Sequence, residues 1–354
     1  MEITLGGGSD PGGFGGIAEA AASLLGGGSS GPAWAEHLIA LSLVQGLAPG
    51  VDHLDLLIAH TEGAPTAALG DSGQVSMGPR GALELVFTGQ VVGIERRGDH
   101  LRRYRLANAG HTLAGTRINQ SVTAMSVADA LQLAAGEAGV GIQGDLGSSD
   151  PPLAQYAFDD SRSLWQHMAA LVALRGARLW CDADDNIRFA DALGDADPVA
   201  ELGYGRDLLE VRLWQRSTHS GSVTVFGGGR GDDGFTLRKQ VGPNRATGGD
   251  GAPQRFHRDG VLQSQAELTA RVDALRLAGA WRTGAGELVA AGSAALAPGR
   301  TIELTSLPDG DDGRYLILAS HHRLDHRDGW RTRIEIVAAN AGASGLGGTL
   351  GGLL

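Results

Sequence analysis

The sequence predicts an α+β protein that is mainly β, with a small α/β domain inserted between two strand-rich domains. Glycine accounts for 57 of the 354 residues and aromatic residues for only 5%, a composition that favours strands joined by many turns. Before residue 119 and after residue 203, apolar residues alternate with period two, as in half-buried strands. Between these stretches the apolar period becomes that of helices.

We therefore expect five segments along the chain. A Gly-rich N-terminal extension (1–32) precedes a first strand-rich domain (33–119) and an inserted α/β domain (120–202). A second strand-rich domain with one helix (203–340) and a Gly-rich tail (341–354) follow. The extension encloses one apolar stretch, IAEAAASLL, so it is either a flexible tail or a docking peptide that becomes ordered only in an assembly.

Two short sequences define strands in the first strand-rich domain. The segment GALELVFTG places Leu83, Leu85 and Phe87 on one face of a strand, because side chains alternate with period two. The segment VVGIERRGDHLRRYRLAN then indicates two strands around a turn at 97–99.

The inserted domain contains two predicted helices with polar caps. Ser126 can cap the first helix, with Asp129 three residues later in a capping-box arrangement. Ser161 or Ser163 can cap the second, which is expected to end at Gly176. Apolar residues at helical spacing form one stripe on each helix: Val127, Ala130, Leu131 and Ala134 on the first; Leu164, Met168, Leu171 and Val172 on the second.

The second helix and the hairpin after it account for residues 159–191, the stretch of the chain richest in possible catalytic or metal-binding side chains. His167 is expected to project away from the apolar stripe of the helix. ARLWC and IRF are expected to pair around a turn at 184–186, where short polar side chains bond their own backbone. These polar residues therefore indicate structure rather than catalysis.

Charge and targeting signals exclude several classes of partner. The formal net charge is −11, which disfavours binding to phosphate backbones or anionic lipids. The N-terminus shows neither the basic nor the apolar region of a signal peptide, and no apolar run approaches the ~20 residues of a membrane span. The single cysteine, Cys181, excludes an intramolecular disulfide and fits a reducing compartment. We therefore expect a protein of cytosolic origin, and we expect no membrane anchoring.

Two motifs imitate binding sites. Asp182, Asp184 and Asn186 have the spacing of the first half of a calcium loop, but Ile187 and Leu193 replace the Gly and Glu that such a loop needs.

The second motif, with glycines at 229, 231 and 234, imitates a dinucleotide fingerprint. It is followed by a strand-like FTLRKQ rather than by the required helix.

His321, His322 and His326 form the best metal candidate. The preceding segment, GRYLILAS, is strand-like, so His321 and His322 should point to opposite faces of a sheet. We therefore expect structural histidines rather than metal ligands.

The remaining motifs do not indicate chemistry either. Cys181 lies in a predicted strand without an evident base, and the two Arg-Gly-Asp triplets at 97 and 230 are ordinary turn sequences. The sequon at Asn119 has no role without secretion. We assign no catalytic, cofactor-binding or metal-ligating residues, and we expect no enzyme activity and no cofactor.

A third capped helix begins the stretch that carries a family resemblance. Ser264 and Glu267 form a capping box at the start of SQAELTARVDALRLAG. After this helix, Pro-Gly-Arg precedes a strand, a Tyr-led strand runs into a His, and Gly-Trp turns into a last strand. The residues of this ordered set are Pro298, Gly299, Arg300, Tyr315, His322, Leu324, Asp325, Gly329, Trp330 and Thr332.

The order of these elements, together with VFTGQVVGIE at 86–95, resembles the late control protein D family, the baseplate hub proteins of contractile phage tails. Related modules form the hub part of VgrG-type spikes and of phage-derived injection machines. The resemblance covers roughly 33–340; the Gly-rich ends and the loop at 241–254 depart from it.

The resemblance implies two tail-tube-like β-barrel domains and a ring-forming homotrimer, in which closure removes unpaired strand edges. Three copies give six similar units, which would adapt a sixfold tail tube to a threefold central spike. The implied partners are further copies of the chain, the tube protein, the spike protein and other baseplate proteins. DNA or protein cargo would slide through the lumen without specific binding, since an acidic wall discourages sticking.

Two other functions are left open by the residues. Unassigned carboxylates in acidic loops could belong to a hub-associated peptidoglycan hydrolase. A secreted adhesin that uses Arg-Gly-Asp is a third reading, disfavoured by the lack of a signal peptide.

Overall fold

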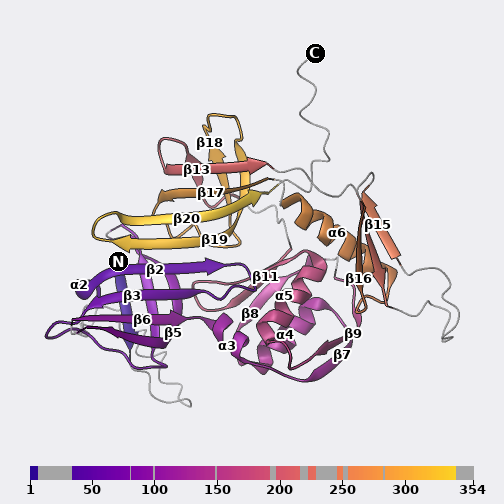
Figure 1. Cartoon of the computed structure of the whole chain (residues 1–354), viewed down its shortest axis with the longest axis horizontal. Helices are drawn as coiled ribbons and strands as arrows, with labels where there is room; N and C mark the ends of the chain where they lie inside the picture. Colours follow the sequence, from indigo (N-terminus) through magenta and orange to yellow (C-terminus); the bar gives the residue numbers. More distant parts are fainter. Residues whose placement is uncertain are drawn as a thin grey trace.

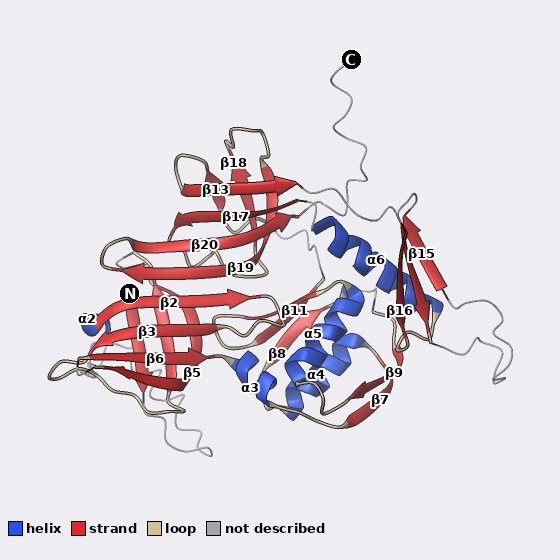
Figure 2. Ribbon diagram, viewed as in Figure 1, coloured by secondary structure: helices blue, strands red, loops and turns tan. Residues whose placement is uncertain are grey.

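The computed structural model describes residues 1–6, 34–79, 81–98, 100–147, 150–191, 197–215, 222–228, 245–249, 254–281 and 284–339. Strands predominate, and they gather into two groups stacked one above the other (Figures 1 and 2). A mixed helical module and a small three-stranded sheet lie beside them. The mainly β, α+β class predicted from the sequence is confirmed.

The first strand group surrounds its own apolar core. Its first strand, β1 (Glu2–Gly6), precedes the short helix α2 (Trp34–His37) in the chain. The other strands follow that helix: β2 (Leu38–Gly46), β3 (His53–Ala59), β4 (Ser72–Met77), β5 (Glu84–Arg97) and β6 (Leu101–Ala107). Alternate residues of these strands point inward, as period two requires. The core includes Leu41, Leu43, Leu54, Leu56, Ile58, Val75, Phe87, Tyr104 and Leu106.

The second strand group has a separate core of the same kind. Its strands are β12 (Glu201–Gly203), β13 (Leu208–Gln215), β17 (Gly284–Ala291), β18 (Thr301–Thr305), β19 (Gly313–Asp325) and β20 (Gly329–Ala338). Its buried residues include Leu288, Leu296, Ile302, Leu304, Ile317, Ile334 and Ile336.

One antiparallel pairing joins the two groups into a single sheet. β2 pairs with β19 in a register that runs from Gly46 opposite Ala319 to Ala40 opposite Asp325. The main path of the sheet has the order β1-β4-β5-β6-β3-β2-β19-β20-β17-β13. Within the described residues the two strand groups thus share one curled sheet over two cores (Figure 1), and the expected pair of tail-tube-like β-barrel domains stays a prediction.

The inserted module contains more elements than its helical period indicates. These are α3 (Ala109–Gly115), β7 (Gln120–Met125), α4 (Val127–Glu137), β8 (Ile142–Asp145), β9 (Leu153–Phe158), α5 (Leu164–Arg175), β10 (Arg178–Cys181) and β11 (Ile187–Ala190). β7 pairs with β9, and β8 pairs in parallel with β11. The predicted hairpin of β10 and β11 is confirmed.

The helix ends follow the predicted capping rules. Ser126 accepts a hydrogen bond from the Asp129 amide at the start of α4. Ser163 forms a full capping box with Gln166 at the start of α5, and Gly176 ends that helix with φ of 69°. A Cβ at Gly176 would lie 2.9 Å from the Cα of Ala274 in the next helix, so glycine also allows two helices to approach closely.

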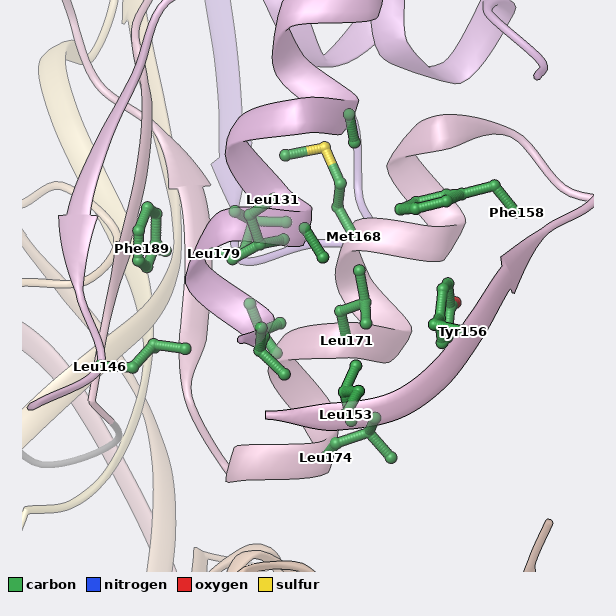
Figure 3. Close-up of a cluster of buried hydrophobic side chains, with 14 of the residues drawn as sticks. Leu131, Leu146, Leu153, Tyr156, Phe158, Met168, Leu171, Leu174, Leu179 and Phe189 are labelled. Atoms are coloured by element: carbon green, nitrogen blue, oxygen red, sulfur yellow. The ribbon is translucent and has the colours of Figure 1, made fainter. Parts of the chain in front are cut away.

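The small sheet differs from the expected organisation. β14 (Ser222–Gly227) pairs with β15 (Arg245–Gly249) and with β16 (Gln254–Asp259), and the sheet packs against α6 (Gln265–Trp281). We expected these residues to belong with the final strands, but their apolar side chains join the core of the inserted module, which Figure 3 shows in close-up. The shared members are Val223, Val225, Ala246, Leu262, Leu268 and Val272.

Two sequence predictions are wrong in detail. Leu83 lies before β5 and is exposed, whereas Val86 and Phe87 are both buried, because a β-bulge opposite Val75 and Ser76 interrupts the alternation. His167 is buried rather than exposed, because other elements surround α5 on several sides.

Candidate assembly surfaces

The predicted calcium-like turn is a folded hairpin turn. Oδ1 of Asp182 accepts hydrogen bonds from the Asp184 and Asn186 amides, at 3.1 and 2.9 Å. Its other oxygen bonds the Arg188 guanidinium at 2.5 Å, and Asp184 itself is exposed. The carboxylate that the motif would offer to calcium is therefore occupied by the turn itself.

The three histidines occupy three different places. His322 is buried and its Nδ1 lies 2.9 Å from Thr332 Oγ1, while Nε2 of His321 lies 2.8 Å from Ser42 Oγ. Nε2 of His326 lies 3.1 Å from the Leu38 carbonyl oxygen. The prediction that His321 and His322 face opposite sides is confirmed. Within the described ranges, no group of three or more His, Cys, Asp or Glu could hold a metal ion.

His167 takes part in a buried polar cluster that the sequence did not reveal. Its Nδ1 lies 2.9 Å from Tyr156 Oη, and its Nε2 lies 3.0 Å from the Asp159 carbonyl oxygen. The rings of Tyr156 and Phe158 meet it edge to face. Burial raises the pKa of Tyr156 to about 12, so the phenol remains a neutral hydrogen-bonding partner in the core.

Two carboxyl groups with raised pKa values lie at the joint between the first strand group and the inserted module. Burial raises the pKa of Asp52 to about 7, and the charge of Asp185 adds to that effect, while bonds from Gly46 and Asn108 oppose it. Burial raises the pKa of Asp185 to about 6, against a bond from the Ala109 amide. Raised carboxyl pKa values are common in hydrolase sites, but Asp52 is only 3% exposed and both of its oxygens accept hydrogen bonds. This pair therefore holds the joint together rather than facing a substrate cleft.

The Pro298-Gly299-Arg300 motif of the second strand group lies near the same joint, so all three parts of the molecule meet there. Gly299 has φ of 80°, and a Cβ there would lie 2.9 Å from the Trp180 ring. Its carbonyl accepts a hydrogen bond from Arg178 at 2.9 Å. A cavity of about 320 Å³ beside it is lined by all three parts of the molecule. Glycine is thus required where the second strand group meets the β10–β11 hairpin.

The outward face of the joined sheet carries cross-strand ion pairs. Asp55 on β3 bonds both Arg103 and Arg105 of β6, the latter through two bonds of 2.9 Å. Burial raises the pKa of Asp55, but the bonds from the two guanidinium groups outweigh it and lower the pKa to about 2. On the other group, Arg333 of β20 bonds Glu287 of β17 at 2.9 Å. The inward face covers the two cores, so the charged face is the face of this sheet that is open to solvent.

A stretch of β5 in the first strand group and a stretch of β13 in the second each have one edge without a strand partner within the described residues. On β5, residues 93–97 pair with β6 on one side only, and on β13, residues 210–213 pair with β17 on one side only. Figure 1 shows β5 and β13 at the two ends of the stack. Apolar side chains are exposed at both: Val92 at 36%, Ile94 at 38% and Leu209 at 55%. Unpaired edges of this kind are templates for pairing with another chain.

Sequence reasoning missed these edges for a physical reason. VVGIERR and LLEVRLWQ are evident strands. Whether both edges of such a strand are paired depends on contacts between distant parts of the chain. The β2–β19 pairing joins residues some 280 positions apart, and no local signal indicates it.

The remaining motifs lie outside the described residues. These are the glycine motif at 229–234 with its Arg-Gly-Asp triplet, the apolar stretch of the N-terminal extension, the C-terminal tail and most of the loop at 241–254. Cys181 is buried beside Asp52, and burial raises its pKa well above the ordinary value, so it is a poor nucleophile. No helix in the described part of the chain combines the length and the apolar character needed to cross a membrane.

The fold matches solved structures of phage tail proteins. A tail protein from Neisseria meningitidis superposes with a TM-score of 0.67 at 15% identity, over 86% of this chain and 93% of that one. A prophage tail protein from Shewanella oneidensis superposes with a TM-score of 0.66 at 14% identity, over 86% of this chain and 95% of that one. A component of the type VI secretion system of Escherichia coli, described as structurally similar to T4 bacteriophage tail proteins, gives 0.55 at 14% identity, over 85% and 73%.

The chain therefore has the fold shared by phage tail proteins and a type VI secretion component, and its resemblance to contractile-tail hub proteins is confirmed at the level of the fold. No protein-family model and no curated protein matches the sequence.

Proposed function

We propose that the chain is a structural baseplate hub of a contractile tail or injection particle. Three copies would form a ring that joins a sixfold tail tube to a threefold central spike. The observation that carries this proposal is the single sheet over two cores, with a stretch of unpaired strand edge in each strand group. Two similar strand groups in each of three copies give six units around one axis, which is the number a sixfold tube requires.

Pairing of these edges between copies would close the ring. Residues 93–97 of one copy would add to residues 210–213 of the next, which would cover Val92, Ile94 and Leu209 and satisfy both backbone edges. A contact between two different surfaces closes only if the rotation between copies brings the last back to the first. The curl of the sheet supports such a rotation.

We assign the lumen to the charged outward face of the sheet. On that face, Asp55 is paired with Arg103 and Arg105, and Glu287 with Arg333. Charges neutralised within the wall leave little net attraction for DNA or a protein cargo. Composition alone suggested an acidic wall, and an ion-paired wall would serve the same purpose of letting cargo slide.

The proposed partners are the tube protein, the spike protein and other baseplate proteins. Support comes from the fold, which recurs in named tail proteins and in a secretion-system component. The same neighbours favour a structural role over the hydrolase alternative, which a zymogram on peptidoglycan tests directly. We expect no cleared band, and a cleared band would revive that alternative.

Mass determination tests the ring. We expect a species of three times the 36.4 kDa chain mass, either alone or after co-expression with the spike protein. Ile94→Lys and Leu209→Lys each place a charge on one edge and should abolish this species while leaving the monomer folded. Val199→Lys is the matched control, because Val199 is 39% exposed and its amide bonds Thr301 of β18, away from both edges. Edge variants that assemble as well as this control would exclude the proposed pairing.

A further inference from the structure

The small sheet of β14, β15 and β16 has one face that the described residues do not cover. α6 packs against the opposite face, where Val223, Val225 and Ala246 are buried with residues of the helix. Residues of the uncovered face alternate with these along the strands. We call it the Arg–Phe face, and it consists of Thr224, Phe226, Arg245, Thr247, Phe256 and Arg258.

The register places one aromatic residue between two arginines, with a second aromatic ring beside the first. Phe226 lies opposite Arg245 on one side and Arg258 on the other. The ring of Phe256, 62% exposed, lies 6.2 Å from that of Phe226. Thr224 Oγ1 and Thr247 Oγ1 are 2.8 Å apart and satisfy each other. Aromatic and arginine side chains together are the residues enriched at the centres of protein interfaces.

The charge of this face is unusual for the molecule. The whole chain has a formal net charge of −11, yet the six residues of the face include two arginines and no acid. Elsewhere arginines such as Arg105 and Arg333 are held in ion pairs, whereas neither Arg245 nor Arg258 forms one within the described residues. The face therefore favours an acidic binding partner.

The chain itself presents a matching acidic segment. The turn PDGDDG at 308–313, between β18 and β19, contains Asp309, Asp311 and Asp312. Asp312 accepts hydrogen bonds from the Ser306 and Leu307 amides, at 3.2 and 2.7 Å, and so fixes the turn. Within the described residues the carboxylates of Asp309 and Asp311 form no ion pair, and Asp309 is exposed.

The two surfaces cannot meet within one molecule. In Figure 1, β18 and its turn lie at the end of the second strand group, and β15 and β16 lie at the far side of the molecule, beyond α6. We propose that the Arg–Phe face of one copy binds the 308–313 turn of a second copy. Such a contact joins two different surfaces head to tail, so it can repeat from copy to copy. It does not depend on the strand edges assigned to the hub ring.

Charge reversal on each side separates this contact from other effects. Arg245→Asp with Arg258→Asp reverses the face, and Asp309→Arg with Asp311→Arg reverses the turn while keeping Asp312. A quadruple variant combines both pairs, so it keeps the net charge of the parent and restores opposite charges across the contact. Arg117→Asp with Arg255→Asp is the matched control, because both arginines are exposed and lie off the face.

Sedimentation of the full chain at about 0.05 M and about 0.5 M salt provides the readout, because screening by salt weakens exposed charge pairs. We expect each double variant to weaken self-association at low salt at least tenfold, the control to match the parent, and the quadruple variant to recover. High salt should remove most of the difference between the variants.

Other outcomes would overturn the proposal. Face variants that associate like the control exclude the Arg–Phe face, and a quadruple variant that does not recover excludes the 308–313 turn as its occupant and indicates another acidic partner. If Ile94→Lys disrupts the ring but the charge-reversal variants do not, this contact is refuted and the proposed hub stays intact.

Discussion

Asp52 Oδ2 accepts a hydrogen bond of 2.9 Å from Asn108 Nδ2, and this bond ties the β2–β3 turn to the residue that caps α3. The other oxygen of Asp52 accepts the Gly46 amide at 2.8 Å. The same turn also contacts the other two parts of the molecule. The Leu47 amide donates to the carbonyl oxygen of Leu318 in the second strand group, and the Ala48 amide donates to the carbonyl oxygen of Leu179 in the inserted module. A single buried carboxyl thus fixes the place where all three parts of the chain meet.

Asp52→Asn should flatten the dependence of stability on pH. The folded pKa of Asp52 is raised from 3.8 to about 7, so the folded state binds more protons than the unfolded state between these values. The free energy of unfolding should therefore fall as pH rises from about 4 to about 7. Urea titrations across this window should show a smaller slope in the variant, and an unchanged slope would contradict the assignment of Asp52.

Two adjacent aspartates in the β10–β11 turn should respond very differently to alanine. Asp185 has φ of 66° and accepts the Ala109 amide at the start of α3, so Asp185→Ala should cost roughly 1–2 kcal/mol. Asp184 is exposed, so Asp184→Ala should stay within about 0.5 kcal/mol. Thermal unfolding measures both. A large loss from Asp184→Ala would revive the calcium hypothesis.

Leu171→Asp should destabilise the inserted module strongly. Leu171 is 0% exposed in the core drawn in Figure 3, and an unpaired carboxylate there should cost several kcal/mol. Ala173→Asp lies on the exposed side of the same helix and controls for charge and helix propensity. Equal stability of the two variants, measured by denaturant unfolding, would contradict the observed packing.

His322→Ala should lower stability and leave metal content unchanged. The substitution opens a cavity and removes the shorter of the two hydrogen bonds of Thr332 Oγ1, in a fully buried residue, leaving it only the 3.4 Å bond from the Ser293 amide, at a cost of roughly 2 kcal/mol. His100→Ala, at an exposed turn, is the control. Elemental analysis should give the same metal content for the parent and both variants. A loss of metal from His322→Ala alone would show that this histidine is a ligand.

Local signals predicted the helix ends well, and non-local contacts explain most of the errors. Ser126, Ser163 and Ser264 cap their helices as expected, because a cap bonds backbone groups three residues away. His167 was misplaced because a single apolar stripe predicts burial on one side only. Contacts of α5 with α3, α4, α6 and β10 bury other sides of the helix as well.

The organisation of the sheet was the least predictable feature. The strands themselves follow from period two, but their order depends on the pairing of β2 with β19, and the core that receives β14 to β16 depends on α6. The Arg–Phe face has the same origin. Phe226, Arg245 and Arg258 become neighbours only through strand register.

Electron cryomicroscopy of the chain in complex with its spike protein tests the central claim most directly. We predict three copies around one axis, six strand groups facing the lumen with their ion-paired surfaces, and residues 93–97 of each copy beside residues 210–213 of the next. A complex with another copy number, or one in which both of these edges face solvent, would contradict the proposed hub.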